Sequence, residues 1–138
     1  MGTTLWVLSR NKMTEGDDWD HSVLFGAAEK LDPLCERLGV KKFTSFLDWT
    51  DFNAAEDEEF PSEDELKKRA SWFAPQDALQ TLRALRDRLA TNDHERKQLF
   101  EDDLQHLSDC ILEELDDCIT KVEKIGADGD VFHLCVVM

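Results

Sequence analysis

The sequence predicts an α+β fold that is mostly helical, with three to four helices packed against a small sheet formed by the N- and C-terminal strands. Two observations predict this fold. Short apolar segments lie at opposite ends of the 138-residue chain, and the residues between them carry apolar side chains at steps of three and four, which is helical spacing. A chain of this length is typical of one domain, so we expect residues 1–138 to form a single domain.

The two predicted strands are residues 3–9 and 131–137. Both are apolar at successive positions, as at residues 5–8 and 134–137, and not at alternate ones. Alternation would indicate one face in water, whereas continuous apolarity indicates burial on both faces. We therefore expect the two strands to share one sheet, with the ends of the chain close together.

Residues 21–38 form the first predicted helix, and Gly39 is its expected C-terminal stop. Pro33 lies inside this segment and removes one backbone hydrogen bond. We expect either a kinked helix or a break at which Asp32 caps a second helix that begins with Pro33. The apolar stripe on which this helix is based consists of Leu24, Ala27, Ala28, Leu31, Cys35 and Leu38.

Three further helices are predicted after residue 61. Ser62 and Glu65 have the spacing of a capping box, Pro75 opens a Leu-rich helix, and a last helix spans residues 94–125. The apolar stripe of the last helix is wider than a coiled-coil seam, so this helix is expected to pack into a globular core. Outside that stripe we expect a solvated face of carboxylates, which comprises Glu113, Asp116 and Asp117.

The charge balance excludes two classes of partner. The chain has 31 Asp and Glu residues against 16 Lys and Arg residues, and its formal net charge is −15. Nucleic acids and anionic membranes both require a basic protein surface, so we expect neither as a partner. No apolar run has the length of an export signal or a membrane span, and the four cysteines include no C-x-x-C pair. We therefore expect reduced thiols and a cytoplasmic protein.

Residues 43–62 are the least regular part of the chain, and residues 48–65, which we call the acidic segment, contain nine acidic residues and no basic one. One interpretation is a solvated loop whose aromatic residues pack into the core. The other is a docking surface for a basic protein, in which aromatic anchors are surrounded by charge. The candidate partner-binding residues in this second interpretation are Asp48, Trp49, Asp51, Phe52, Glu56, Asp57, Glu58 and Glu59. The other tryptophans are expected in the core or at a helix entry.

Two His–Cys pairs form the best metal candidate. His106 and Cys110 share one face of the last predicted helix, and His133 and Cys135 share one side of the last strand. Two nitrogens and two sulfurs would suit tetrahedral zinc if the pairs converged. The spacing matches no zinc motif, and buried His and Cys are common in protein cores, so we expect no metal and no other cofactor. A small metalloprotein or enzyme that uses these four residues is the alternative function.

Catalytic motifs are absent from the sequence. It contains no G-x-S-x-G nucleophile and no glycine-rich phosphate loop. Only one predicted helix carries an acid-x-x-His pattern, whereas a di-iron bundle requires this pattern on two helices. We therefore assign no catalytic residue and expect a protein that is not an enzyme.

Residues 72–85, in which an aromatic pair and Pro75 lead into a Leu-rich helix, resemble a pattern found in a family of small, acidic, uncharacterised bacterial proteins. Residues 1–8, 34–40 and 46–51 are similar to that family as well. The resemblance implies a bacterial cytoplasmic protein and carries no activity, although some such proteins look like immunity or accessory proteins.

These observations lead us to expect a non-catalytic acidic protein that binds another protein or acts as an accessory protein. An immunity-type antagonist of a basic partner is the most specific form of this hypothesis. A third possibility is an accessory protein that assembles through an open edge of the terminal strands, so monomer and homodimer both remain open.

Overall fold

The computed structural model describes residues 3–100 and 107–137. Its strands are β1 (Thr4–Ser9), β2 (Leu47–Asp48) and β3 (Phe132–Val137). Its helices are α1 (Ser22–Leu38), α2 (Thr50–Ala54), α3 (Glu63–Arg69), α4 (Pro75–Thr91), α5 (Asp93–Gln98) and α6 (Leu107–Ala127), with short 3-10 helices η1 (Met13–Glu15) and η2 (Phe43–Phe46). The predicted α+β fold, with both terminal strands in one sheet, is confirmed.

β3 is the central strand of a sheet that has the order β1-β3-β2 within the described residues. β1 runs antiparallel to β3, from Thr4 opposite Val137 to Ser9 opposite Phe132. β2 pairs with β3 in parallel and contains two residues, which is too few for a sequence periodicity to reveal. Every residue of β3 is buried, as the continuous apolarity of this segment predicted.

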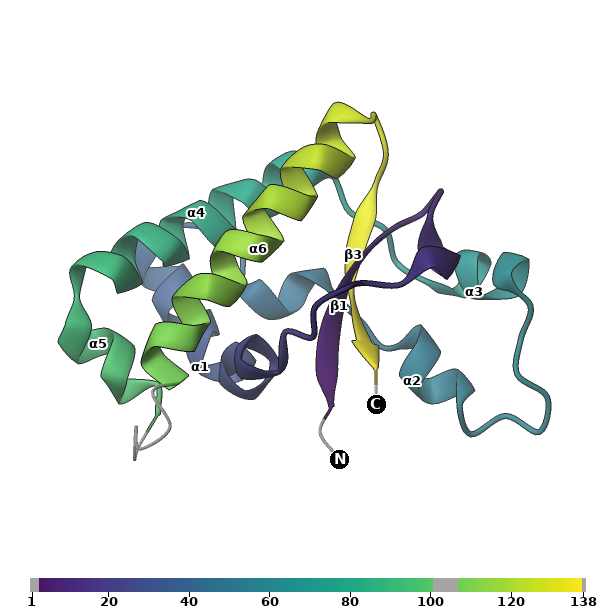
Figure 1. Ribbon diagram of the computed structural model, residues 1–138, viewed down its shortest axis with the longest axis horizontal. Coiled ribbons are helices and arrows are strands. Elements are labelled where there is room, and N and C mark those ends of the chain that lie inside the picture. Colours follow the sequence, from purple (N-terminus) through teal and green to yellow (C-terminus); the bar gives the residue numbers. More distant parts are fainter. Residues whose placement is uncertain (1–2, 101–106, 138) are drawn as a thin grey trace.

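The two faces of the sheet carry different layers (Figure 1). The inner face packs against α1, α4, α6 and η2, and β3 contributes Phe132, Leu134 and Val136 to this main core. The outer face lies toward η1, α2 and α3, where Cys135 and Val137 form a smaller cluster with side chains of β1 and η1. Alternate residues of β3 therefore serve two separate apolar layers.

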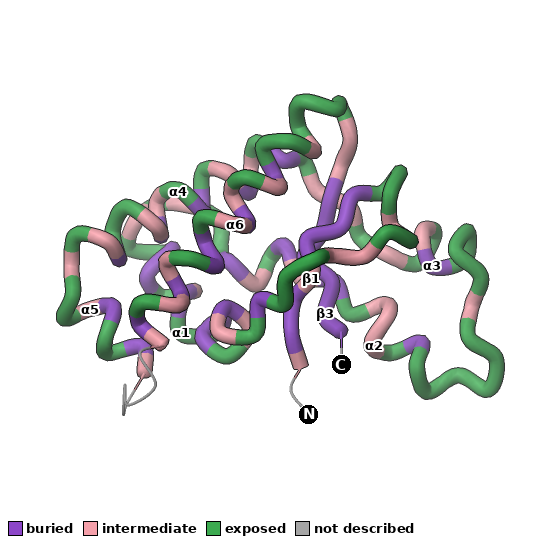
Figure 2. Tube along the Cα trace, viewed as in Figure 1, coloured by how far each residue is buried: buried purple, intermediate pink, exposed green. Residues whose placement is uncertain are grey.

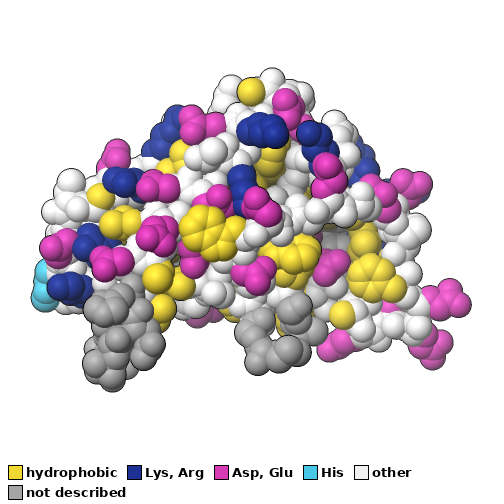
Figure 3. Space-filling model, in the orientation of Figure 1, with side chains coloured by type: hydrophobic (Ala, Val, Ile, Leu, Met, Phe, Trp, Pro, Cys, Tyr) yellow, Lys and Arg dark blue, Asp and Glu magenta, His cyan; other side chains and the backbone are white. Residues whose placement is uncertain are grey.

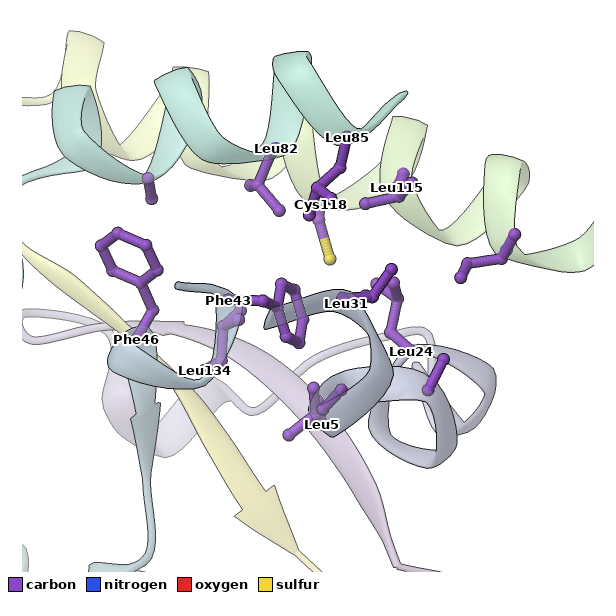
Figure 4. Close-up of a cluster of buried hydrophobic side chains, with 14 of the residues drawn as sticks. Leu5, Leu24, Leu31, Phe43, Phe46, Leu82, Leu85, Leu115, Cys118 and Leu134 are labelled. Carbon is purple, nitrogen blue, oxygen red and sulfur yellow. The ribbon is translucent and has the colours of Figure 1, made fainter. Parts of the chain in front are cut away.

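The main core lies between the helices and the inner face of the sheet. Side chains of α4 and α6 point toward α1, η2 and the sheet (Figure 4), and the labelled residues include Leu31, Phe43, Leu82, Leu85, Leu115, Cys118 and Leu134. Full burial of one Leu or Phe side chain contributes about 1.5–3 kcal/mol to stability. The apolar stripes predicted for α1, α4 and the last helix therefore converge on one core.

Local sequence signals set several of the helix ends. Gly39 ends α1 in the left-handed conformation with φ 74°, and the Ser62 side chain caps α3 by accepting a hydrogen bond from the Glu65 N–H. Helix α1 continues through Pro33, so the alternative of a break is wrong. The Asp32 carboxylate does not cap a helix that begins at Pro33; it accepts hydrogen bonds from the backbone N–H and the hydroxyl of Thr44 in η2.

The prediction of one long helix over residues 94–125 is wrong. Helix α5 ends at Gln98, and the last described helix begins at Leu107. The N–H groups of Leu99 and Phe100 bond to carbonyls three residues earlier, which tightens the end of α5. The buried Arg96 also donates to the Leu89 carbonyl near the end of α4. These contacts hold α5 against α4.

The outer edge of β1 is closed by the segment that precedes α1. The Val7 N–H donates to Asp17 Oδ2 at 2.8 Å, and the Leu5 carbonyl accepts from the His21 N–H at 3.1 Å. The imidazole of His21 is fully buried, with Nδ1 2.9 Å from the Leu5 oxygen and Nε2 2.7 Å from Asp117 Oδ2. The ring therefore lies between a carbonyl oxygen of β1 and a carboxylate of α6. The Leu5 carbonyl and the Val7 N–H are therefore already occupied and are not open for strand pairing with a second chain.

One expectation about an individual side chain is wrong. Asp117 does not belong to a solvated face, because it bonds to His21 and forms a 2.8 Å ion pair with Lys121. The contacts of residues 17–21 with β1 and α6 decide this outcome, and those contacts have no local sequence signal. Trp19, expected in the core or at a helix entry, lies two residues before the His21 cap position of α1 and is 40% exposed, so it is not in the core.

Candidate functional site

The acidic segment lies at the outer side of the sheet, where it forms β2, α2, the α2–α3 connection and the first turn of α3. In Figure 2 the α2–α3 connection is exposed along most of its length, far from the helices of the inner face. β2 anchors one end of the segment in the sheet, and the Ser62 cap fixes the other end at α3. The connection is therefore presented to solvent between two fixed ends.

Four of the candidate carboxylates, Glu56, Asp57, Glu58 and Glu59, are all exposed on this connection. Figure 3 shows acidic side chains at the end of the molecule that the connection forms. Asp57 pairs with Arg69 of α3 at 3.1 Å. The other three form no ion pair with any residue in the ranges 3–100 and 107–137, so their charges are not neutralised within the described chain.

The aromatic residues of the acidic segment differ in exposure. Trp49 is 42% exposed and Phe60 is 58% exposed, whereas Phe52 is half-buried against the main core. Trp49 contacts Phe25 of α1 and Phe52 edge to face, with ring centroids 6.0 and 5.4 Å apart. Beside Trp49 an open groove of about 570 Å³ runs between α1 and β2. Two large apolar side chains thus remain partly uncovered among the acidic residues.

The two remaining candidates lie deeper than the others. Asp48 is 6% exposed, and its carboxylate accepts hydrogen bonds from the backbone N–H groups of Thr50 and Ser71. It therefore joins β2, α2 and the chain after α3, and it is not placed to meet a partner. Asp51 is half-buried; burial raises the pKa of its carboxyl, and the charge of Asp48 adds to this shift.

A pocket of about 190 Å³, which we call the sheet pocket, lies beneath this segment on the outer face of the sheet. Its apolar wall consists of Trp6, Leu8, Met13, Leu66, Cys135 and Val137. Its polar wall includes Asp48, Asp51 and His133. The residues come from β1, β3, η1, α2 and α3, so only the folded chain assembles them.

His133 is the most unusual residue of the sheet pocket. It is 2% exposed, and its ring stacks on Trp72 with a centroid distance of 4.1 Å and an interplanar angle of 12°. Nδ1 lies 3.0 Å from the carbonyl oxygen of Ser71, whereas Nε2 is buried without a hydrogen-bond partner among the described residues. Burial lowers the pKa of His133, although the nearby Asp48 carboxylate acts in the opposite direction.

The four residues of the zinc alternative are not assembled within the described chain. His106 lies outside the described residues. Cys110 is on α6, which covers the inner face, whereas His133 and Cys135 are on the outer face. The ranges 3–100 and 107–137 contain no group of three or more His, Cys, Asp or Glu side chains placed to hold a metal ion.

Nucleophilic chemistry at Cys135 is also disfavoured. The side chain is 3% exposed, and burial raises the pKa of its thiol to about 12, with the charges of Asp51 and Asp48 adding to the shift. A thiol with this pKa stays protonated at neutral pH, and the thiolate is the reactive form. Cys135 therefore acts as an apolar wall residue of the sheet pocket.

Sequence reasoning places His133 and Cys135 on one side of the last strand but misses their neighbours. Trp72 and Ser71 hold the imidazole of His133. The sequence around Trp72 indicates only a helix entry, and Ser71 lies in no catalytic motif. Trp72 lies three positions before Pro75, and its stacking partner His133 lies 61 positions further along the chain. No local sequence pattern could reveal this contact.

No protein-family model, curated protein or solved structure matches the chain. The resemblance of residues 72–85 to small acidic bacterial proteins therefore stays a prediction. None of the helices in the described ranges has the length and apolar character needed to cross a membrane.

Proposed function

We propose that the chain is a non-catalytic binding protein whose acidic segment docks on a basic protein, in the manner of an immunity-type antagonist. The observation that carries this proposal is the exposed α2–α3 connection, in which Glu56, Glu58 and Glu59 have no ion-pair partner among the described residues. Carboxylates that serve only to stabilise the fold would be expected to pair with the chain's own Lys and Arg residues, as Asp57 does with Arg69.

Two exposed aromatic residues supply the apolar component of this surface. Binding energy at protein interfaces is concentrated in a few buried anchors, and Trp is prominent among them. Trp49 lies beside an open groove, and Phe60 follows the four exposed carboxylates directly in the sequence. A basic partner would bury these rings and place its Lys and Arg residues opposite the surrounding carboxylates.

The net charge of the chain supports fast association with such a partner. A formal charge of −15 attracts cationic proteins over several ångströms and raises their encounter rate, with a strong dependence on salt. Charges at the rim of an interface act mainly on the association rate, whereas buried anchors act mainly on the dissociation rate. The proposal therefore predicts separate kinetic roles for the glutamates and for Trp49.

The test begins with capture of partners by the full chain from bacterial lysate, identification of the captured proteins, and kinetic measurement with each purified candidate. The charge-reversal variant is Glu56→Lys, Glu58→Lys and Glu59→Lys together. We expect it to lower the association rate about tenfold or more at low salt. The control variant, which changes the net charge equally, reverses the exposed residues Asp87, Glu113 and Asp128, and it should lower the rate by less than about threefold.

A matched pair of tryptophans tests the apolar anchor. Trp49→Ala should weaken binding by about tenfold or more, chiefly through faster dissociation. Trp19→Ala removes a tryptophan of similar exposure elsewhere on the surface and should leave binding unchanged. Polylysine serves as the non-specific reference, because its binding should respond equally to both charge variants. The proposal fails if the captured protein behaves like polylysine or if no captured protein is basic.

A further inference from the structure

The open groove beside Trp49, which we call the α1 groove, has one aromatic wall and one acidic wall. Its apolar side chains include Phe25, Leu47 and Trp49. Trp49 is 42% exposed, so a large part of its ring is open to a partner. The acidic wall consists of Glu29 and Asp32, which lie three residues apart on α1 and therefore on one face of the helix. An exposed aromatic ring and two carboxylates thus border the same hollow.

Neither carboxylate of the α1 groove forms an ion pair with any residue in the ranges 3–100 and 107–137. Glu29 is exposed on the surface of α1. Asp32 accepts hydrogen bonds from the backbone N–H and the hydroxyl of Thr44, one at each of its oxygens. A carboxylate has about four lone-pair positions, so Asp32 can still accept from a further donor. The groove therefore presents negative charge that the described chain does not pair.

Two lysines close to these carboxylates are engaged elsewhere. Lys30 also lines the α1 groove, but its ammonium donates to the carbonyl oxygen of Leu99, at the end of α5, at 3.1 Å. Lys42 precedes η2, and its ammonium pairs with Glu36 at 3.1 Å. Because the lysines of the chain do not bond to the acidic wall, a cation of a partner is the complementary group for it.

The chemistry of the two walls favours a guanidinium over other groups. A guanidinium is planar and weakly hydrated, it stacks on aromatic faces, and its five N–H donors can meet two carboxylates at once. A lysine ammonium is a compact and strongly hydrated charge, which suits an aromatic wall less well. A purely apolar side chain would desolvate Glu29 and Asp32 without pairing them, which is unfavourable. The three-carbon stem of an arginine can also lie along the Phe25 ring.

We propose that the α1 groove receives an arginine side chain of the basic partner, with its guanidinium on the Trp49 ring and bonded to Glu29 and Asp32. This inference rests on the proposed function, because it names the group of the partner that Trp49 meets. It extends the docking surface from the acidic segment onto α1, a helix that the candidate residues of the sequence do not include.

The test uses the full chain and three blocked tripeptides that carry arginine, lysine or citrulline between two glycines, followed by NMR titration at low salt. Citrulline has the shape of arginine without its charge. The arginine peptide should bind with a Kd on the order of 10 mM and shift the indole N–H of Trp49. The lysine peptide should bind about threefold more weakly and the citrulline peptide about tenfold more weakly. The assignment is overturned if either of these binds as tightly as the arginine peptide, or if the Trp49 indole does not shift.

Variants of α1 locate the bound peptide. Glu29→Gln should weaken binding of the arginine peptide about fivefold and leave the citrulline peptide unchanged. Glu113→Gln makes the same change of charge at an exposed position of α6 and should leave both peptides unchanged. Gly26 lines the groove and has open space at its Cβ position, so Gly26→Leu should fill the groove and abolish binding. Equal effects of Glu29→Gln and Glu113→Gln would show that only the net charge matters and would refute the site.

The captured partner separates failure of this inference from failure of the proposed function. The proposed function depends on charge reversal at Glu56, Glu58 and Glu59, whereas the α1 groove depends on Glu29. If charge reversal slows association with the partner but Glu29→Gln changes neither partner nor peptide affinity, the groove assignment alone fails. If the arginine peptide binds at Trp49 but no basic partner responds to charge reversal, the proposed function fails while the arginine site stands.

Discussion

The Glu114 carboxylate of α6 caps α1 by accepting a 3.0 Å hydrogen bond from the backbone N–H of Leu24. Its second oxygen accepts from the N–H of Val23 at 3.4 Å. The first turn of α1 has no side-chain cap of its own, because His21 occupies the cap position without bonding to it. A buried residue 90 positions away therefore satisfies N–H groups that a local Ser or Asp usually satisfies.

Glu114→Ala should lower the free energy of unfolding by about 1–3 kcal/mol, because the buried Leu24 N–H and the partly buried Val23 N–H lose their acceptor. Glu113→Ala, a change on the exposed side of the same helix, should alter it by less than about 0.5 kcal/mol. Urea denaturation monitored by tryptophan fluorescence measures both. Equal losses for the two variants would contradict the capping role.

Glu114→Gln keeps one hydrogen-bond acceptor but cannot ionise. Comparison of this variant with the wild type therefore measures how ionisation of Glu114 contributes to the pH dependence of stability. Burial raises the pKa of Glu114 above its usual value. The folded state therefore favours the protonated form, and this contribution to stability is present at low pH and lost as the pH rises through the raised pKa. Stability of the wild type relative to Glu114→Gln should increase as the pH falls from 7 toward about 4.5, and a constant difference would refute the assignment.

His133 predicts a pH dependence of opposite direction. Burial lowers its pKa in the folded state, so below about pH 6.5 the unfolded chain binds a proton that the folded chain does not. Stability should decrease on acidification below this value, with a slope of at most about 1.4 kcal/mol per pH unit from this residue. The difference in unfolding free energy between the wild type and His133→Gln at pH 7.5 and 5.5 measures it. If both proteins lose the same stability, His133 makes no such contribution.

Two glycines, one inside α1 and one at its end, should respond in opposite directions to the same substitution. Gly26 lies within the helix with open space at its Cβ position, so Gly26→Ala should stabilise by about 0.5–1 kcal/mol. Gly39 also has open space but a φ of +74°, so Gly39→Ala should destabilise by about 1–2 kcal/mol. Thermal unfolding of the two variants provides the comparison. A shift of the same sign in both would show that backbone conformation does not control the outcome.

Leu85→Ala should destabilise the fold more than any of the preceding substitutions. Leu85 is fully buried between α4 and the residues below it in Figure 4, and loss of such a side chain costs about 2–5 kcal/mol. Leu79→Ala, at a half-buried position of the same helix, should cost less than half as much. Chemical denaturation gives both values, and a similar cost at the two positions would contradict the placement of Leu85 at the centre of the core.

The sequence by itself determined the features that depend on neighbouring residues. The terminal strands, the end of α1 at Gly39, the cap at Ser62 and the start of α4 at Pro75 were all predicted, because each is set by hydrophobic patterning or by backbone geometry within a few residues. The convergence of apolar stripes also made one core between helices and sheet predictable.

Only the tertiary structure decided the features that join distant segments. The capping of α1 by Glu114 spans 90 positions and the hold of Ser71 on His133 spans 62, and no periodic pattern encodes such pairs. The end of α5 at Gln98 was likewise not predicted, because the apolar stripe of the sequence continues past it as if for one helix. The spacing of apolar residues shows which face of a helix or strand is buried. Buried polar groups, by contrast, find their hydrogen-bond partners only in the folded chain. Each of them must bond to groups that the packing of distant elements brings near.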